Sequence, residues 1–374
     1  MRIVFFCHSL ISDWNHGNAH FLRGVIRDLQ RRGHDVRVFE PDGGWSLGNL
    51  LADVGNTAVE EFQAAYPGLT SAFYNPATID LHSALEGADV VIVHEWSDHG
   101  LVHRIGRHRR HHRYCLLFHD THHRAVTDPG SMAAYDLSAF DGVLAFGDVL
   151  RRIYLERGWA RAAWTWHEAA DPSIFHPMDA PREGDLAWIG NWGDDERARE
   201  LSEFLLEPVR ALGIGASVYG VRYPREALAA LSEVGISFRG YLPNVRVPEV
   251  FARYGVTVHV PRRPYAHALP GIPTIRMFEA LACGIPLVSA PWDDAEHLFT
   301  PGRDYLVAQD GEVMQRHLRR LLAERDYARA LGERGRHTVI ARHTCAHRVD
   351  DLLVILRNNF DLEESTEPAA CVAG

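Results

Sequence analysis

The chain has 374 residues, of which 46% are hydrophobic and 24% are charged, and its formal net charge is −10. This length and composition suit two globular domains with sizeable cores, and the acidic balance argues against a general nucleic-acid-binding protein. Five dispersed cysteines without a CxxC pair argue against a disulfide framework and against a thiolate zinc site. Because no apolar run reaches the roughly 20 residues of a membrane span and no secretory h-region opens the chain, we expect a cytoplasmic protein without a transmembrane segment.

The first part of the chain alternates apolar runs with amphipathic helical patterns. Residues 2–8 form a continuous apolar run typical of a buried strand, and residues 20–32 place their apolar side chains on one helical face before Gly33. Residues 34–41 read as the next strand, which completes a βαβ unit. The same rhythm continues with strands predicted at 88–96, 114–120 and 142–147 and a helix predicted at 151–158.

A second set of alternating elements begins near residue 185. Alternating β and α elements predict parallel sheets that are covered by helices on both faces. Two such sets predict an α/β chain with two doubly wound, Rossmann-like domains. The strands of the second set are predicted at 185–192, 216–221, 236–242, 256–262 and 285–291, and its helices at 195–212, 224–234, 246–254, 274–283 and 311–335.

The irregular, proline-containing segment 171–185 predicts the linker between the domains. We expect an N-terminal domain at residues 1–178 and a C-terminal domain at residues 179–341. A final amphipathic helix at 342–358 is expected to pack back on the N-terminal domain. The aperiodic residues 361–374 are expected to form a disordered tail.

Ligands of parallel α/β sheets bind outside the carboxyl ends of the strands, so residues at these ends are candidate site residues. His119 and Asp120 end one buried strand of the first half, and Glu95 ends another. Imidazole and carboxylate groups suit proton transfer or the binding of a substrate hydroxyl, so these three residues are the candidate catalytic residues. A structural role is the alternative for each. The loop after the first strand adds Gly17 and Asn18.

Cationic and glycine-containing loops follow the strands of the second half. Gly190 and Asn191 begin a GxxG loop, Arg197 lies on the helix after it, and Arg222 follows the strand that ends at Val221. Guanidinium groups suit a diphosphate because they donate paired hydrogen bonds. For each arginine alone, a structural salt bridge is an equal alternative.

The start of the predicted helix 274–283 offers a further anion site. Free backbone N–H groups at Thr274 and Ile275, together with the helix dipole, would attract a phosphate. Arg276 either holds that phosphate or pairs with an acid. Glu279 either accepts hydrogen bonds from a ribose diol or is a surface carboxylate.

Twenty-three histidines raise the question of a metal site. One dense group is His108, His111 and His112, and another lies within residues 119–123. Arginines surround the first group, which favours a solvated basic helix or a surface for an anionic partner over a bound cation. We therefore expect no catalytic metal. No GxGxxG follows the first strand, so the NAD fingerprint is absent at its expected place.

Several segments resemble GT-B glycosyltransferases of the family-four type. Residues 169–177 (AADPSIFHP) are similar to the segment that enters the linker in that family, and residues 276–292 (RMFEALACGIPLVSAPW) to its EAMACGxPVV segment. Residues 293–307 resemble the stretch that follows, and residues 16–40 resemble the family's opening. Residues 276–284 carry an Arg-x-Phe-Glu before Ala-Cys-Gly, a feature of the CgeB-like glycosyltransferases.

The resemblance covers most of residues 1–355 and implies a GT-B fold with a nucleotide-sugar site between the domains. It implies that Glu279 binds the donor ribose, that Arg197 holds phosphate and that His119 lies near the transferred sugar. The remaining implied donor contacts are the backbone amides of Thr274 and Ile275 at the diphosphate, Gly17 in the loop that closes over the donor, and Gly240, Tyr241 and Leu242 at the base.

One position departs from the family pattern. Retaining members usually carry a first Glu eight residues before the second, and here that position is Gly271. The expected activity is the transfer of a sugar from a nucleotide diphosphate sugar, the co-substrate, to a small-molecule, glycan or lipid acceptor. We expect the transfer to retain the anomeric configuration and to need neither a metal ion nor a cofactor. A sugar-nucleotide epimerase and an inactive GT-B-fold binding protein are the alternatives, and the missing fingerprint disfavours an NAD-dependent enzyme.

Overall fold

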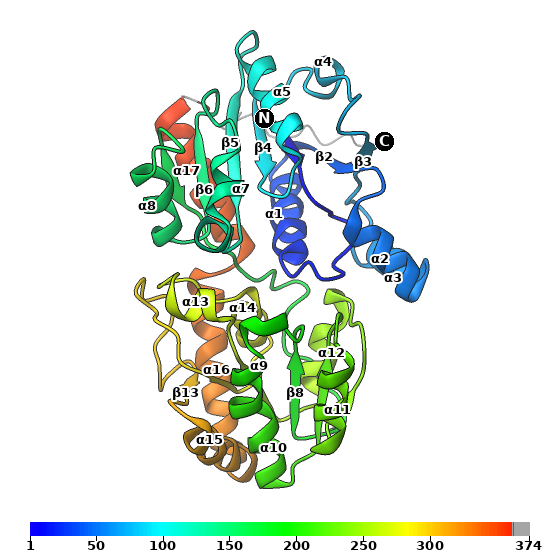
Figure 1. Ribbon diagram of the computed structural model, residues 1–374, viewed down its shortest axis with the longest axis vertical. Helices are drawn as coiled ribbons and strands as arrows, with labels where there is room; N and C mark the ends of the chain where they lie inside the picture. Colours follow the sequence, from blue (N-terminus) through cyan, green and yellow to red (C-terminus); the bar gives the residue numbers. More distant parts are fainter. Residues whose placement is uncertain (361, 363–374) are drawn as a thin grey trace, which may run out of the picture.

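The structure is a computed structural model and describes residues 1–360 and residue 362. Two α/β domains lie one above the other (Figure 1), and each is built on one parallel sheet. The predicted fold class, two doubly wound domains, is confirmed. The tail predicted at 361–374 lies outside the described residues apart from residue 362.

The N-terminal domain contains a seven-stranded parallel sheet in the order β3-β2-β1-β4-β5-β6-β7. The order reverses between β1 and β4, which creates the topological switch point at which such sheets bind ligands. All side chains of β4 and β5 are buried, as expected for strands covered on both faces. The strands are β1 (Arg2–Phe6), β2 (Asp35–Pro41), β3 (Ala72–Tyr74), β4 (Val90–His94), β5 (Cys115–Asp120), β6 (Gly142–Ala145) and β7 (Ala163–Thr165).

The helices of this domain differ widely in length. The predicted first helix is present as α1 (Ala19–Arg31), and Gly33 follows it with a φ of +86°, a left-handed conformation that favours glycine. The other helices are α2 (Trp45–Val54), α3 (Thr57–Ala65), α4 (Leu81–Ala84), α5 (His99–Arg109), α6 (Arg124–Thr127), α7 (Pro129–Ala133) and α8 (Asp148–Glu156).

The C-terminal domain contains a six-stranded parallel sheet in the order β10-β9-β8-β11-β12-β13. Its strands are β8 (Leu186–Ile189), β9 (Ala216–Tyr219), β10 (Ser237–Phe238), β11 (Val256–His259), β12 (Leu287–Ser289) and β13 (Leu306–Val307). Its helices are η1 (Asp194–Glu196), α9 (Ala198–Leu201), η2 (Ser202–Leu206), α10 (Glu207–Leu212), α11 (Arg225–Glu233), η3 (Asn244–Arg246), α12 (Val247–Ala252), α13 (Arg263–His267), α14 (Ile275–Ala282), α15 (Gly311–Ala323) and α16 (Arg325–Arg342).

Two predicted helices of this domain are interrupted. The helix predicted at 195–212 is divided into η1, α9, the π-helical η2 and α10. Pro208 lacks the N–H that would bond to the carbonyl oxygen of Phe204, which explains the π-helical turn, and the extended φ of −154° at Arg197 separates η1 from α9. The helix predicted at 311–335 is divided at Glu324, whose ψ is 80°. The two pieces pack on different partners, since α15 contacts α10 and α16 contacts α14.

The last helix, α17 (Cys345–Phe360), crosses back and packs against α1 of the N-terminal domain. Trp166 donates a hydrogen bond from Nε1 to the carbonyl oxygen of Arg348 at 2.7 Å. A Cβ atom on Gly24 of α1 would lie 2.5 Å from Sγ of Cys345, so the close approach of the two helices requires glycine at this position. No helix of the described residues is long and apolar enough to cross a membrane.

Candidate active site

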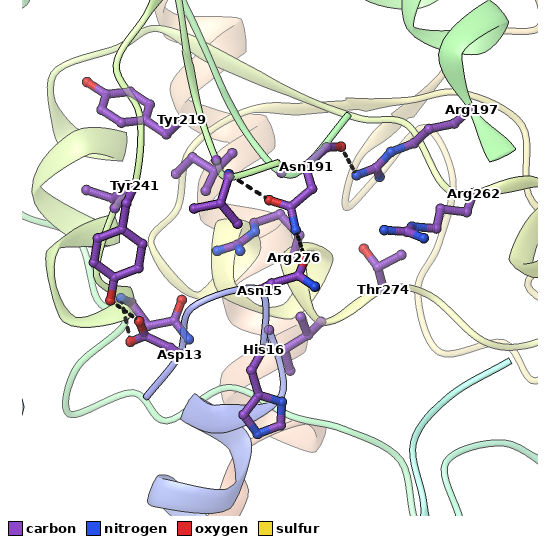
Figure 2. Close-up of a pocket in the computed structure, with 18 of the residues that line it drawn as sticks. Asp13, Asn15, His16, Asn191, Arg197, Tyr219, Tyr241, Arg262, Thr274 and Arg276 are labelled. Atoms are coloured by element: carbon purple, nitrogen blue, oxygen red, sulfur yellow. Dashed lines mark hydrogen bonds between the residues drawn. The ribbon is translucent and has the colours of Figure 1, made fainter. Parts of the chain in front are cut away.

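A cavity of about 220 Å³ lies between the two domains at the carboxyl ends of both sheets. The N-terminal domain contributes the loop after β1 and the loop after β5, and the C-terminal domain contributes the loops after β8, β9 and β11 and the start of α14. Figure 2 shows that the labelled side chains of both domains converge on one space. The position agrees with the switch-point rule for parallel sheets.

Arg197 is the most buried cation of this cavity. It is 9% exposed, and its guanidinium donates only to backbone carbonyl oxygens: Val260 at 3.0 Å, Trp192 at 3.4 Å and Asn191. No described carboxylate forms an ion pair with it. Burial, followed by the nearby Arg262 and Arg276, lowers the pKa of Arg197 from its usual value. Its buried positive charge therefore lacks a counter-ion within the described chain.

Two further guanidinium groups line the same cavity. Arg262 follows β11 and pairs with Glu196 at 2.8 Å, and its side chain is 24% exposed. Arg276 lies in the first turn of α14 and pairs with Glu279. Three cations on one wall make a site whose electrostatics suit a multiply charged anion.

The start of α14 faces this cationic wall with its backbone N–H groups uncapped by a side chain. Thr274 is the N-cap residue, but its hydroxyl lies 3.0 Å from Nε2 of His259 and makes no capping hydrogen bond. Ser289 donates its hydroxyl hydrogen to the carbonyl oxygen of Ala290, so it accepts from Nδ1 of His259 at 2.8 Å. His259 therefore accepts at Nε2 and draws the Thr274 hydroxyl away from the helix. The first N–H groups of α14 remain available to an anion.

The glycine loop after β8 is held by contacts to both domains. Asn191 accepts a hydrogen bond from the Val221 backbone N–H at 2.9 Å, and its amide donates to Asn15 of the N-terminal domain. The carbonyl oxygen of Gly190 would lie 2.2 Å from a Cβ atom on Gly220, so glycine is required where these two loops cross. The loop is thus fixed against the cavity.

The loop between β1 and α1 crosses from the N-terminal domain to the opposite wall. Asp13 pairs with Arg23 at 2.9 Å, accepts from the backbone N–H of Asn244 at 3.0 Å and accepts from the hydroxyl of Tyr241. A Cβ atom on Gly17 would lie 3.2 Å from Cγ2 of Ile275, which shows how closely this loop approaches α14. The described structure is therefore a closed arrangement of the two domains around the cavity.

Two imidazoles from the loop after β5 also line the cavity. Thr127 donates its hydroxyl to the carbonyl oxygen of His123 at 3.2 Å, so it accepts from His123 Nδ1 at 2.9 Å. This leaves Nε2 of His123 as an acceptor; that atom is buried without a hydrogen-bond partner, and the nearest carboxylate oxygen, Oε2 of Glu196, lies 3.7 Å away. Burial, with a smaller contribution from neighbouring cations, lowers the pKa of His122 to about 2. Both rings are neutral at pH 7, since the pKa of His123 is lowered to about 4, again mainly by burial.

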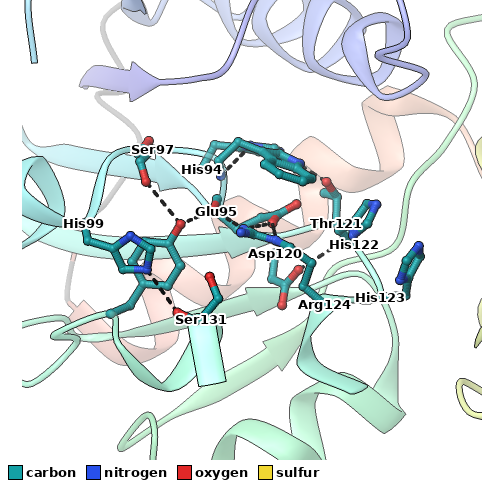
Figure 3. Close-up of polar contacts among 12 residues, drawn as sticks. His94, Glu95, Ser97, His99, Asp120, Thr121, His122, His123, Arg124 and Ser131 are labelled. Atoms are coloured by element: carbon teal, nitrogen blue, oxygen red, sulfur yellow. Dashed lines mark hydrogen bonds and ion pairs between the residues drawn. The ribbon is translucent and has the colours of Figure 1, made fainter. Parts of the chain in front are cut away.

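None of the three candidate catalytic residues lines the cavity. Figure 3 shows two of them, Glu95 and Asp120, beside Arg124 and the loop that carries His122 and His123. Glu95 is fully buried and pairs with Arg124. Asp120 accepts from the Tyr154 hydroxyl at 2.8 Å and from the His122 backbone N–H at 3.0 Å, so it holds the loop that presents His122. Burial raises the pKa of Asp120 to about 6 and that of Glu95 to about 8.

His119 is 1% exposed and packs among aromatic rings. Its ring lies 4.8 Å from Trp166, 5.3 Å from His94 and 6.1 Å from Phe21. Neither of its nitrogen atoms has a hydrogen-bond partner, and burial lowers its pKa to about 3. The side chain of His119 therefore points into the N-terminal core in this structure.

The structure places most of the predicted donor-binding residues on the cavity. Glu279 does not reach it: the carboxylate is fully buried between Arg276 and His20 of α1, whose Nδ1 lies 2.6 Å away. Asn18 donates to the Thr121 hydroxyl at 2.6 Å, and Arg222 is exposed outside the cavity lining. The predicted residues that line the cavity are Gly17, Gly190, Asn191, Arg197, Tyr241, Leu242, Thr274, Ile275 and Arg276.

Several lining residues had no predicted role. Asp13, Asn15 and His16 lie in the polar loop after the first strand, and Arg262 lies at the end of a predicted strand, so the strand ends predicted their segments but did not assign these side chains a role. His122 and His123 belong to the histidine group at residues 119–123 and directly follow β5, but the sequence suggested them only as metal ligands. Tyr265 and Asn244 carry no comparable sequence signal.

Comparisons with known proteins agree with this architecture. The family described as "Glycosyltransferase Family 4" matches residues 15–171, and the family described as "Glycosyl transferase-like" matches residues 197–354. No curated protein matches the sequence.

Solved structures show the same fold at low sequence identity. Sucrose-phosphate synthase from Thermosynechococcus elongatus is 15% identical with a TM-score of 0.65, covering 96% of this chain and 99% of its own. Anabaena HepE in complex with UDP and glucose is 12% identical with a TM-score of 0.68, at 95% and 99% coverage. T4 phage BGT in complex with UDP-glucose is 10% identical with a TM-score of 0.62, at 97% and 100% coverage.

The fold and the cleft define a protein of the GT-B type. With a glycosyltransferase domain matched in each half, the chain is a glycosyltransferase. These findings support sugar transfer from a nucleotide sugar.

Proposed function

We propose that the protein transfers a sugar from UDP-sugar to a small-molecule, glycan or lipid acceptor, without a metal ion and with retention of the anomeric configuration. The observation that carries the proposal is the buried Arg197, which forms no ion pair with a carboxylate of the described residues and lines the cavity together with Arg262 and Arg276. UDP is chosen because the similar structure of HepE is a complex with UDP and glucose and that of BGT is a complex with UDP-glucose. The Arg-x-Phe-Glu segment at residues 276–279 supports a place near the CgeB-like glycosyltransferases.

The cationic wall would stabilise the departing diphosphate. Negative charge develops on the leaving phosphate as the glycosidic bond breaks, and preorganised donors at that place lower the barrier. Arg197, Arg262 and the N-terminus of α14 would supply these donors, and Glu279 would act as a positioning residue that orients Arg276. Asp13 is the one carboxylate among the described lining residues, and it is already paired with Arg23, which supports catalysis without a divalent cation.

The neutral imidazoles would bind the sugar side of the donor. His123 presents Nε2 as an acceptor toward the cavity, so it suits a sugar hydroxyl that donates. His122 lies beside it and is held by Asp120. In this arrangement Asp120, Glu95 and His119 would support the loop from behind, and Asp120 would be a positioning residue.

Two adjacent arginines provide a matched test. Arg262 lines the cavity, whereas Arg263 pairs with Glu200 outside it, and both side chains are partly exposed. Arg262→Gln should weaken UDP binding about 10- to 100-fold, because it removes a hydrogen bond from a charged donor. Arg263→Gln should change the affinity for UDP less than about twofold. Isothermal titration calorimetry with and without EDTA measures both effects.

Equal affinities of the two variants for UDP would show that the diphosphate does not bind at the wall formed by Arg197, Arg262 and Arg276. Loss of UDP binding in EDTA would refute metal independence. Product analysis with UDP-sugars completes the test, because an acceptor-independent change of the sugar would assign an epimerase instead. The anomeric coupling constant of the product, measured by NMR, decides between retention and inversion.

A further inference from the structure

Three histidines gather on the N-terminal domain away from the cavity. His82 belongs to α4, His108 lies in the last turn of α5, and His112 lies in the turn that follows α5. Figure 1 shows both helices at the end of this domain remote from the C-terminal domain. One ring nitrogen from each of the three lies within 4.8 Å of the others. The rings of His108 and His112 stack at 3.8 Å, and His82 lies 5.6 Å from His112.

The hydrogen bonds of His108 fix its tautomer. Tyr114 donates its hydroxyl hydrogen to the carbonyl oxygen of Ile105 at 3.4 Å, so the Tyr114 oxygen accepts from Nδ1–H of His108 at 3.1 Å. Nε2 of His108 therefore carries a lone pair. That atom is buried and has no hydrogen-bond partner, a state that costs free energy unless a ligand is bound.

The hydrogen bond of His112 leads to the same form. Its Nδ1 lies 2.9 Å from the carbonyl oxygen of His108, and a carbonyl oxygen can only accept, so Nδ1 carries the hydrogen. Nε2 of His112 is thus also a lone-pair donor. A histidine that ligates a metal characteristically donates its other ring N–H to a carbonyl or similar acceptor, as both rings do here.

We propose that His82, His108 and His112 bind one divalent transition-metal ion, with Zn²⁺ as the probe, and that the ion joins α4 to α5. Imidazole is a preferred ligand of such ions, and three imidazoles with one water complete a tetrahedral shell. Zn–N bonds of about 2.0–2.1 Å need donor atoms about 3.3 Å apart. The present limit of 4.8 Å closes to that value by side-chain rotation: His82 is exposed on a short surface helix and can move toward the pair. One of the two stacked rings must also turn, because the planes of His108 and His112 are parallel to within 2° and their lone pairs do not yet converge.

The surrounding charges are compatible with a cation. The flanking Arg109 is paired with Asp141 at 3.3 Å, and Arg107 and Arg110 are exposed to solvent, where salt screens them. The negative end of the α5 dipole lies at the site. Asp80 caps α4 by accepting from the His82 backbone N–H at 3.0 Å, which adds a nearby negative charge.

The test uses tag-free full-length protein that has been stripped with EDTA and then titrated with Zn²⁺ by calorimetry. We expect one saturable site per chain. His82→Ala should weaken Zn²⁺ binding more than about 10-fold, whereas His111→Ala, an exposed imidazole of the same segment, should leave it unchanged. Co²⁺ loaded into the unchanged chain should show the visible absorption of a tetrahedral site, and His82→Ala should abolish that absorption.

The proposal is overturned if the unchanged chain shows no saturable Zn²⁺ site, or if His82→Ala and His111→Ala bind Zn²⁺ equally well. Circular dichroism establishes that both variants are folded, which is expected because both side chains are exposed. UDP binding serves as a second control, because the triad shares no residue with the cavity between the domains.

Discussion

Gly271 offers the sharpest test of why this chain departs from the family pattern. Its φ is +86°, and a Cβ atom at this position would lie 2.7 Å from both Cγ and Oε1 of Glu296. Glu296 joins the domains: it accepts from the Asp148 backbone N–H at 2.9 Å and contacts Nε2 of His167 at 2.9 Å. The missing first Glu is thus replaced by a glycine that makes room for another carboxylate.

The expected cost of Gly271→Ala has two parts. The left-handed backbone costs a residue with a Cβ about 1–2 kcal/mol. Displacing Glu296 weakens two hydrogen bonds worth about 1 kcal/mol each. Gly271→Ala should therefore destabilise the protein by about 3–4 kcal/mol. Gly33 also has a φ of +86°, but a Cβ atom at this position would have no neighbouring atom within 4 Å. Gly33→Ala should therefore lower the free energy of unfolding by only about 1–2 kcal/mol.

Equilibrium denaturation in urea, followed by circular dichroism, measures these differences. In a Glu296→Ala background the clash is absent, so Gly271→Ala should cost only the backbone part, and the double-mutant cycle should give a coupling of about 2 kcal/mol. Equal costs at Gly271 and Gly33, or an additive cycle, would refute the reasoning. A destabilised Gly271→Glu would further show that this chain cannot regain the family carboxylate by one substitution.

Three further predictions concern acid stability, catalysis and closure. The pKa of His119 is about 3 in the folded protein and about 6.5 in the unfolded chain, so its contribution to stability is full above about pH 6.5 and is lost as pH falls toward 3. Between pH 7 and pH 5 this lowers the free energy of unfolding by about 2 kcal/mol. In His119→Leu, denaturation at the two pH values should show a decrease in the free energy of unfolding that is about 2 kcal/mol smaller than in the wild-type protein. His122→Ala should lower kcat about 10- to 100-fold in a steady-state assay with UDP affinity nearly unchanged, whereas His111→Ala should not alter kcat. Tyr241→Phe removes the hydroxyl that donates to Asp13 across the cleft, so it should weaken UDP binding about 10-fold and give a larger radius of gyration in solution scattering. An unchanged radius of gyration would show that this hydrogen bond does not hold the two domains closed.

The order of strands and helices was largely readable from the sequence, for a physical reason. Strands of a parallel sheet are buried on both faces, and β4 and β5 accordingly appear as continuous apolar runs. The edge strands β3 and β13 have three and two residues, and their apolar signal is too short to separate from a loop. A strand was predicted at 236–242, but β10 contains only Ser237 and Phe238 of it. Interruptions such as Glu324 depend on which neighbour each helix packs against, and no local pattern encodes that.

The sequence predicted which loops form the site better than it predicted which side chains of those loops reach the cavity. Strand ends predicted the loops that form the cavity, and Arg197, Thr274 and Arg276 lie on its wall. His119 and Glu279 show the limit of this reasoning. His119 is still within β5, so its direction is set by the sheet, and Glu279 faces α1 rather than the cleft because it lies more than one turn beyond the helix start.

The buried Arg197 links donor binding to the stability of the whole cleft. The guanidinium of Arg197 donates to carbonyl oxygens and forms no ion pair with a described carboxylate, and the nearby Arg262 and Arg276 add to the cost of burying its charge. Under the proposed function, an anion bound in the cavity would offset this cost. Uncapped N–H groups at Thr274 would gain from the anion in the same way, because His259 takes the hydroxyl that would cap them. A bound diphosphate would pair with the Arg197 guanidinium and accept from the uncapped N–H groups of α14. The free energy gained from both contacts would contribute to its affinity.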